Sequence, residues 1–242
     1  MRLKEFDLDL PYICDEKNVA SIVAQRRCER NEATTVDYQM NWNDKRFRFS
    51  LETRSIASFF SRLFGYINTK DCWKILVDCV PEIFEERILN FSGVYAVQIQ
   101  FDYDSFAKLS DINKKKVTLE LLMSGIKKVA LDQSWDMSPF ENTYSKIIEA
   151  DYVNEWIWKK PVKSPNRKNV ASVFLQHEVN EIDISIIVSD IKGVEILRKK
   201  VITELPDEWM YSQHLGEVKW INDEKVVIIN KAGDNEWQVC LN

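Results

Sequence analysis

Few residues of this chain could form a catalytic centre. It contains two histidines, His177 and His214, and its nearest approach to a carboxylate pair is Asp102 and Asp104 in the stretch QFDYDSF. Carboxylates two positions apart share one face of a strand, where they could divide acid and base roles or bind a metal ion. A hydrolase-like enzyme with a dispersed Asp/His site therefore stays open, although such a pair more often marks the end of a strand and the cap of a helix.

The familiar catalytic and cofactor motifs are missing. There is no Gly-x-Ser-x-Gly, no glycine-rich phosphate loop and no His-Glu-x-x-His, and only six glycines occur in the chain. The five cysteines are widely spaced and include no Cys-x-x-Cys pair, which disfavours both a zinc site and a disulfide framework. We therefore expect no catalytic residue set, no metal site and no cofactor.

The composition indicates a soluble, cytoplasmic globular protein. Hydrophobic residues make up 45% of the chain and charged residues 29%, close to globular averages. The first residues lack the layout of a signal peptide, and no apolar run reaches the roughly 18 residues that cross a bilayer. No membrane association is expected, and the oligomeric state does not follow from the sequence.

One acidic and aromatic segment has the composition of a protein-binding loop. TELPDEWMYSQHLGE, residues 203–217, is the longest interruption in the strand-rich part of the chain. Loops on rigid scaffolds often carry binding function, and Trp and Tyr are enriched at the anchors of protein interfaces. We predict a protein-binding site made of Asp207, Glu208, Trp209 and Tyr211. The alternative is a short helix that closes the end of a sheet with Trp209 and Met210.

A basic cluster suggests a third interpretation. Lys159, Lys160, Lys163, Arg167 and Lys168 lie within ten residues that contain no acid, next to two tryptophans. Neutralisation of phosphates combined with base stacking would make the 159–168 hairpin a nucleic-acid binder. A solvated hairpin tip is the commoner origin of such lysines, so nucleic-acid binding remains an alternative that we do not favour.

The first 150 residues mix helix and strand signals. Asp15 should cap a helix, and the alternation of apolar residues from Val36 to Leu51 predicts a β-hairpin, followed by a helix over 55–66. Strands are expected near 73–79 and 94–101, joined by a short helix that begins at Pro81. Two central helices are expected. The first is amphipathic, begins at Asp111 and is weakened by Gly125, and the second covers 139–150.

From Tyr152 onward only strand signals remain. About seven strands with short connections predict one antiparallel meander. The predicted class is therefore α+β, with a mixed portion over 1–150 and an antiparallel sheet portion over 151–242. No Gly, Pro or Ser-rich linker separates them, which leaves open whether they form one cooperative domain.

Charge is distributed unevenly between these portions. Residues 170–242 carry 13 acidic and 7 basic residues, whereas the rest of the chain is nearly neutral. An acidic sheet portion with an aromatic loop suits a basic protein partner. We therefore expect a non-enzymatic, cytosolic protein-binding module, of the kind represented by bacterial immunity proteins that neutralise a basic toxin.

Overall fold

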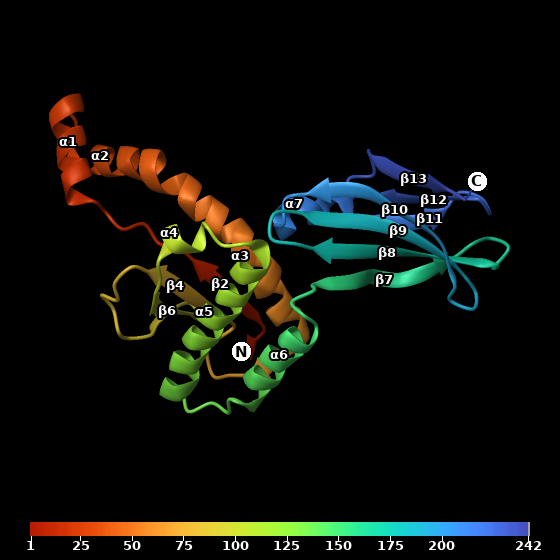
Figure 1. Ribbon diagram of the computed structural model, residues 1–242, viewed down its shortest axis with the longest axis horizontal. Coiled ribbons are helices and arrows are strands. Elements are labelled where there is room, and N and C mark those ends of the chain that lie inside the picture. The colour runs from red at the N-terminus through yellow and green to blue at the C-terminus, as the bar shows by residue number, and fades with distance from the viewer. Residues whose placement is uncertain (242) are drawn as a thin grey trace. The chain divides into compact units, whose positions relative to one another are not determined.

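The computed structural model describes residues 1–241, and the chain divides after Tyr152 into two compact units. Each unit encloses its own cluster of buried apolar side chains. Helices and a mainly parallel sheet form the first unit, and antiparallel strands dominate the second (Figure 1). The predicted α+β class is confirmed.

A four-stranded sheet organises the first unit. Its strands have the order β2-β4-β6-β5, in which the first three are parallel and β5 pairs antiparallel with β6. A separate antiparallel pair joins β1 to β3. The bounds are β1 Arg2–Leu3, β2 Glu5–Asp9, β3 Ile67–Asn68, β4 Lys74–Val80, β5 Leu89–Phe91 and β6 Val94–Gln100.

Alternation along these strands separates an apolar face from a more polar one. Leu8, Val77 and Val97 lie side by side on the three parallel strands, and all are buried. Asp9 and Asp78 occupy the next register position and face the opposite side. The apolar face packs against helix α5 (Asp111–Asp132), which contacts β2, β4 and β6.

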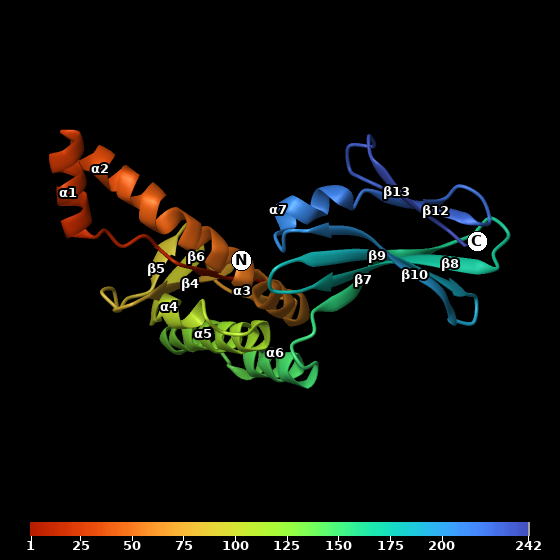
Figure 2. The same cartoon turned by 45° about the horizontal axis from the view of Figure 1, so that its top comes forward.

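The other helices of the first unit are α1 (Glu16–Arg26), α2 (Arg30–Asp37), α3 (Asn43–Phe64), α4 (Tyr103–Phe106) and α6 (Ser138–Glu149). As predicted, the Asp15 side chain caps α1, accepting hydrogen bonds from two backbone N–H groups of its first turn. Helices α1 and α2 form a hairpin that stands away from the sheet of this unit (Figures 1 and 2).

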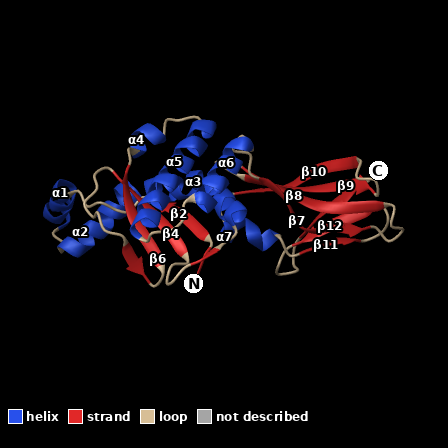
Figure 3. Cartoon of the chain, turned by 90° about the horizontal axis from the view of Figure 1, so that it is seen from below, coloured by secondary structure: helices blue, strands red, loops and turns tan. Residues whose placement is uncertain are grey.

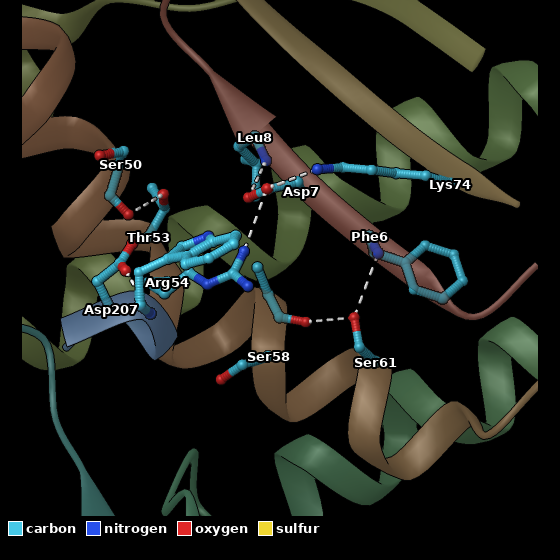
Figure 4. A network of polar contacts seen from close by, with 12 residues as sticks. Phe6, Asp7, Leu8, Ser50, Thr53, Arg54, Ser58, Ser61, Lys74 and Asp207 are labelled. Carbon is cyan, nitrogen blue, oxygen red and sulfur yellow. Dashed lines mark hydrogen bonds and ion pairs between the residues drawn. The ribbon is translucent and has the colours of Figure 1, made fainter. Parts of the chain in front are cut away.

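Helix α3 covers the edge of the sheet at β2. Ser61 accepts a hydrogen bond from the backbone N–H of Phe6 at 3.2 Å, an edge group with no strand partner on that side (Figure 4). The rings of Phe60 and Phe64 meet Phe6 edge to face, with centroids 4.8 and 4.9 Å apart. The helix therefore protects an edge that would otherwise be open to strand addition.

The hairpin predicted for residues 36–51 is wrong. The chain is instead helical from Arg30 to Phe64, through α2, a π-helical turn η1 (Tyr38–Trp42) and α3. The predicted helix over 55–66 is the last part of α3. Phe49, Ile56 and Phe60 form a buried stripe at helical spacing over several turns, and burial of that stripe outweighs a short alternating pattern. The short helix predicted at Pro81 is also absent, since residues 81–88 form a loop.

Two antiparallel sheets form the second unit (Figure 3). One has the order β10-β9-β8-β7 and the other β11-β12-β13. The bounds are β7 Glu155–Lys163, β8 Asn169–His177, β9 Ile182–Asp190, β10 Glu195–Glu204, β11 Glu217–Trp220, β12 Lys225–Ile229 and β13 Glu236–Cys240.

One apolar core joins these two sheets. Leu175 and Ile186 of the larger sheet and Ile228 of the smaller one are fully buried in it, and Trp156 and Trp158 pack against it. Figure 2 shows β12 and β13 lying over the larger sheet. The continuous meander that we predicted is therefore divided: after β10 the chain crosses through residues 205–216 and begins a second sheet, which buries the apolar face that the first sheet alone would expose.

Candidate functional site

The predicted binding segment forms a short helix in the connection from β10, in the larger sheet, to β11, in the smaller one. Helix α7 (Glu208–Tyr211) continues into a 3₁₀ turn, η2 (Ser212–His214). The Asp207 side chain caps α7 by accepting a hydrogen bond from the Trp209 backbone N–H at 2.8 Å. Tyr211 is buried in the core of this unit, where its ring lies 5.9 Å from that of His177. The helix is thus held by a capping residue just before its first residue and by a buried ring at its last.

Trp209 is presented to solvent by this helix. It is 90% exposed, and the following Met210 is 40% exposed. A tryptophan so exposed leaves a large apolar surface in contact with water. Of the four predicted site residues, Asp207 and Glu208 are half-buried and Tyr211 is buried, so Trp209 is the only one of the four that is largely exposed to solvent.

The surroundings of Trp209 in the sequence are acidic. Residues 201–218 contain no lysine or arginine, but they include the acidic residues Glu204, Asp207 and Glu208. The Leu205 backbone N–H and the His214 ring hydrogen-bond to the Glu204 carboxylate and lower its pKa. Glu204 therefore stays ionised at neutral pH, and the segment has negative charge.

Asp102 is used as a helix cap. Its carboxylate accepts hydrogen bonds from the Asp104 and Ser105 backbone N–H groups and from the Ser105 hydroxyl, at the start of α4. These bonds lower the pKa of Asp102 and occupy its oxygens. The structure supports the cap interpretation of this carboxylate and gives no support to an acid–base role.

The two histidines lie in the second unit, whereas Asp102 and Asp104 lie in the first. His177 is fully buried, with its Nε2 3.1 Å from the Pro206 carbonyl oxygen, and His214 contacts Glu204. Among residues 1–241, no three His, Cys, Asp or Glu side chains are grouped as metal ligands would be.

One lysine of the basic 159–168 hairpin contacts other residues of the second unit. The Lys159 ammonium donates a hydrogen bond to the Gly216 carbonyl at 3.1 Å and lies 4.2 Å from the centre of the Trp158 ring. Trp158 itself packs against the core. The stacking surface that single-stranded nucleic acid requires is therefore not supplied by this tryptophan.

A pocket that we did not predict lies in the first unit. Its volume is about 720 Å³, within the usual range for small-molecule sites. Leu10, Pro81 and Phe101, which directly follow the parallel strands β2, β4 and β6, contribute to its wall. Trp42, Lys45, Gln100, Asp102, Tyr103 and Asp104 complete the lining.

Crevices beyond the carboxyl ends of parallel strands are the usual ligand sites of such sheets. The signal that could have located this one was the order of the strands, because neighbouring parallel strands bring the residues after them to one edge. The sequence predicted strands near 73–79 and 94–101, but it predicted neither β2 nor the adjacent, parallel order of β2, β4 and β6.

Ion pairs connect the polar side of this sheet to α3. Asp7 contacts both Arg54 at 3.1 Å and Lys74 at 2.9 Å (Figure 4), and Arg46 binds the two carboxylate oxygens of Asp9 at 2.7 and 2.6 Å. Desolvation, followed by the nearby charge of Asp9, raises the pKa of Asp78 to about 6. The sheet thus holds one carboxyl group whose protonation changes near neutral pH.

No helix within residues 1–241 combines the length and hydrophobicity that a bilayer crossing requires. No protein-family model, curated protein or solved structure matches the chain.

Proposed function

We propose that this chain is a non-enzymatic protein-binding module that contacts a basic partner through α7, with Trp209 as the anchor. The observation that carries the proposal is the 90% exposure of Trp209 on a helix held in place by the Asp207 cap and the buried Tyr211. Tryptophan is among the residues that most often dominate the energy of an interface.

The anchoring of α7 by the Asp207 cap and the buried Tyr211 supports a binding role for the exposed Trp209. A side chain on a preorganised element loses less conformational entropy when a partner covers it. The adjacent Met210 extends the apolar area with a side chain that adapts its shape readily. A partner would therefore meet a fixed indole with an adaptable apolar neighbour.

The charge of the segment indicates the sign of the partner. Glu204, Asp207 and Glu208 lie within five residues, and residues 201–218 contain no lysine or arginine. Electrostatic complementarity raises association rates and excludes partners of like charge. In its specific form the proposal is an immunity-type protein that neutralises a basic toxin by covering it.

The experiment compares partner capture by the wild-type chain, by Trp209→Ala and by Phe84→Ala. Phe84 is 70% exposed in the first unit, so its variant controls for general loss of an exposed ring. Proteins retained from a lysate of the native organism by wild type and Phe84→Ala, but not by Trp209→Ala, are purified and titrated against the chain.

We expect a basic partner whose affinity falls at least about 30-fold with Trp209→Ala, the loss typical of an interface hot spot. Association should also slow as salt rises, because charge steers the encounter. For the immunity-type form, wild type should inhibit the activity of the captured partner and Trp209→Ala should not. Equal capture by all three chains, or an acidic partner with salt-independent association, would overturn the proposal.

A further inference from the structure

We propose that the pocket beyond the carboxyl ends of β2, β4 and β6 binds a small aromatic zwitterion, represented by a free aromatic α-amino acid. The site is formed entirely by the first unit and does not depend on the role of α7. Three features support this ligand class: the position of the pocket, its aromatic walls and the pair of opposite charges on its lining.

The position of the pocket favours a ligand because three parallel strands end beside it. Leu10, Pro81 and Phe101 each follow a parallel strand, so the pocket occupies the edge of the sheet where strand geometry leaves a crevice. Leu10 and Phe101 are buried, which provides an apolar floor. A ligand in this crevice would rest on residues whose backbone the sheet holds in place.

The walls are aromatic. Trp42 ends the π-helical turn η1, and its indole N–H donates a hydrogen bond to the Leu10 carbonyl at 3.0 Å. Single π-helical turns interrupting α-helices occur often at functional sites, because they reorient side chains that a regular helix would place elsewhere. With Phe101 and Tyr103, the indole supplies flat apolar surface suited to a ring.

Two opposite charges on the lining, Lys45 and Asp104, form one widely spaced ion pair. The Lys45 ammonium lies 4.0 Å from the Asp104 carboxylate, and it is 5.9 and 5.8 Å from the ring centres of Trp42 and Tyr103. Among the contacts of residues 1–241, neither charged group has a hydrogen bond from its side chain. The nearby Asp102 carboxylate is occupied by the α4 cap.

This charge pattern favours a ligand that has both a positive and a negative charge. A simple anion could bind Lys45 but would be repelled by Asp102 and Asp104, and a simple cation could bind Asp104 but would be repelled by Lys45. An α-amino acid has a carboxylate for Lys45 and an ammonium for Asp104 on one carbon atom. Its ring would lie against the aromatic wall.

The test uses three probes on the full chain. L-tryptophan has both charges, tryptamine lacks the carboxylate, and indole-3-propionate lacks the amine. Calorimetric titration and ligand-observed NMR should show L-tryptophan binding with a dissociation constant on the order of 1 mM, as expected for a ligand of this size. Each singly charged probe should bind about 5-fold more weakly, since it loses one charge-assisted contact.

Variants then assign the charges. Lys45→Gln should abolish the preference for L-tryptophan over tryptamine, and Asp104→Asn should abolish the preference over indole-3-propionate. Lys127→Gln, on an exposed position of α5 outside the pocket, should change neither.

The wild-type probe series decides the question even where a variant folds poorly. The absence of saturable binding by all three probes, tightest binding of a singly charged probe, or preferences that both variants retain would each overturn the proposal. Because α7 takes no part, Trp209→Ala should bind L-tryptophan as wild type does, so failure of this site and failure of the protein-binding site are distinguishable.

Discussion

At the scale of single residues, Asp78 is a carboxyl group whose pKa is raised by its surroundings. It neighbours Asp9 in the parallel register, and Asp9 is already bound by Arg46. Burial disfavours the ionised form, and the Asp9 charge adds to that effect, so the pKa of Asp78 rises to about 6. An ionised Asp78 therefore costs folding stability at neutral pH.

Asp78→Asn should stabilise the protein at high pH but not at low pH. Because the folded-state pKa lies above the unfolded value, the penalty is absent below about pH 4, grows between about pH 4 and 6, and is complete above that range. After discounting for partial exposure, we expect a gain of about 1 kcal/mol at pH 7.5 in urea unfolding and none at pH 4.

The matched control is Asp9→Asn, which removes the bidentate partner of Arg46 and should destabilise the protein at pH 7.5. An equal effect of Asp78→Asn at both pH values would contradict the assignment of the elevated pKa to this residue.

At the scale of elements, the contact between α5 and the sheet depends on Gly125. From the sequence this glycine is a weak point of the helix, since its helix propensity is poor. In the structure, a Cβ atom at position 125 would lie 2.4 Å from Cγ2 of Val77, which is fully buried on β4. The glycine allows the helix to approach the sheet closely.

Gly125→Ala should therefore destabilise the protein, although alanine favours a helix. We expect a loss of about 1–3 kcal/mol in urea unfolding, the usual cost of overpacking a core. Ser124→Ala, on the exposed neighbouring position, should change stability by less than about 0.5 kcal/mol. Val77→Ala should reduce the cost of Gly125→Ala when both are combined, because it removes the atom that clashes. A stabilising Gly125→Ala would show that the helix can shift away from the sheet freely.

At the scale of the whole molecule, each unit has a core of its own. The cluster in the first unit includes Phe6, Phe49 and Leu122, and the cluster in the second includes Leu175 and Ile228. A separate core is the physical requirement for independent folding. The boundary after Tyr152 thus defines two fragments that can be tested directly.

We expect fragments 1–152 and 153–242, expressed separately, to fold. Each should show cooperative thermal unfolding and dispersed NMR signals. Loss of tertiary signals in either fragment, with recovery when the two are mixed, would show instead that the chain is a single cooperative domain.

Several features followed from the sequence because their causes are local. The Asp15 and Asp102 caps require only a carboxylate and the N–H groups two or three residues later. The helices over 111–132 and 138–149 follow from hydrophobic spacing within one segment, and so do the strands after residue 154. Each of these predictions depends on residues that are close together along the chain.

Tertiary structure determined the features that depend on residues far apart in the sequence. The alternation at 36–51 resembles a strand until the buried stripe of Phe49, Ile56 and Phe60 packs against the first core, and then a long helix is favoured. Similarly, no local signal distinguishes the exposed Trp209 from the buried Tyr211, because only the neighbouring sheets determine which ring has space in the core. The pocket combines residues from positions 10, 42–45, 81 and 100–104, which only the parallel order of β2, β4 and β6 brings together.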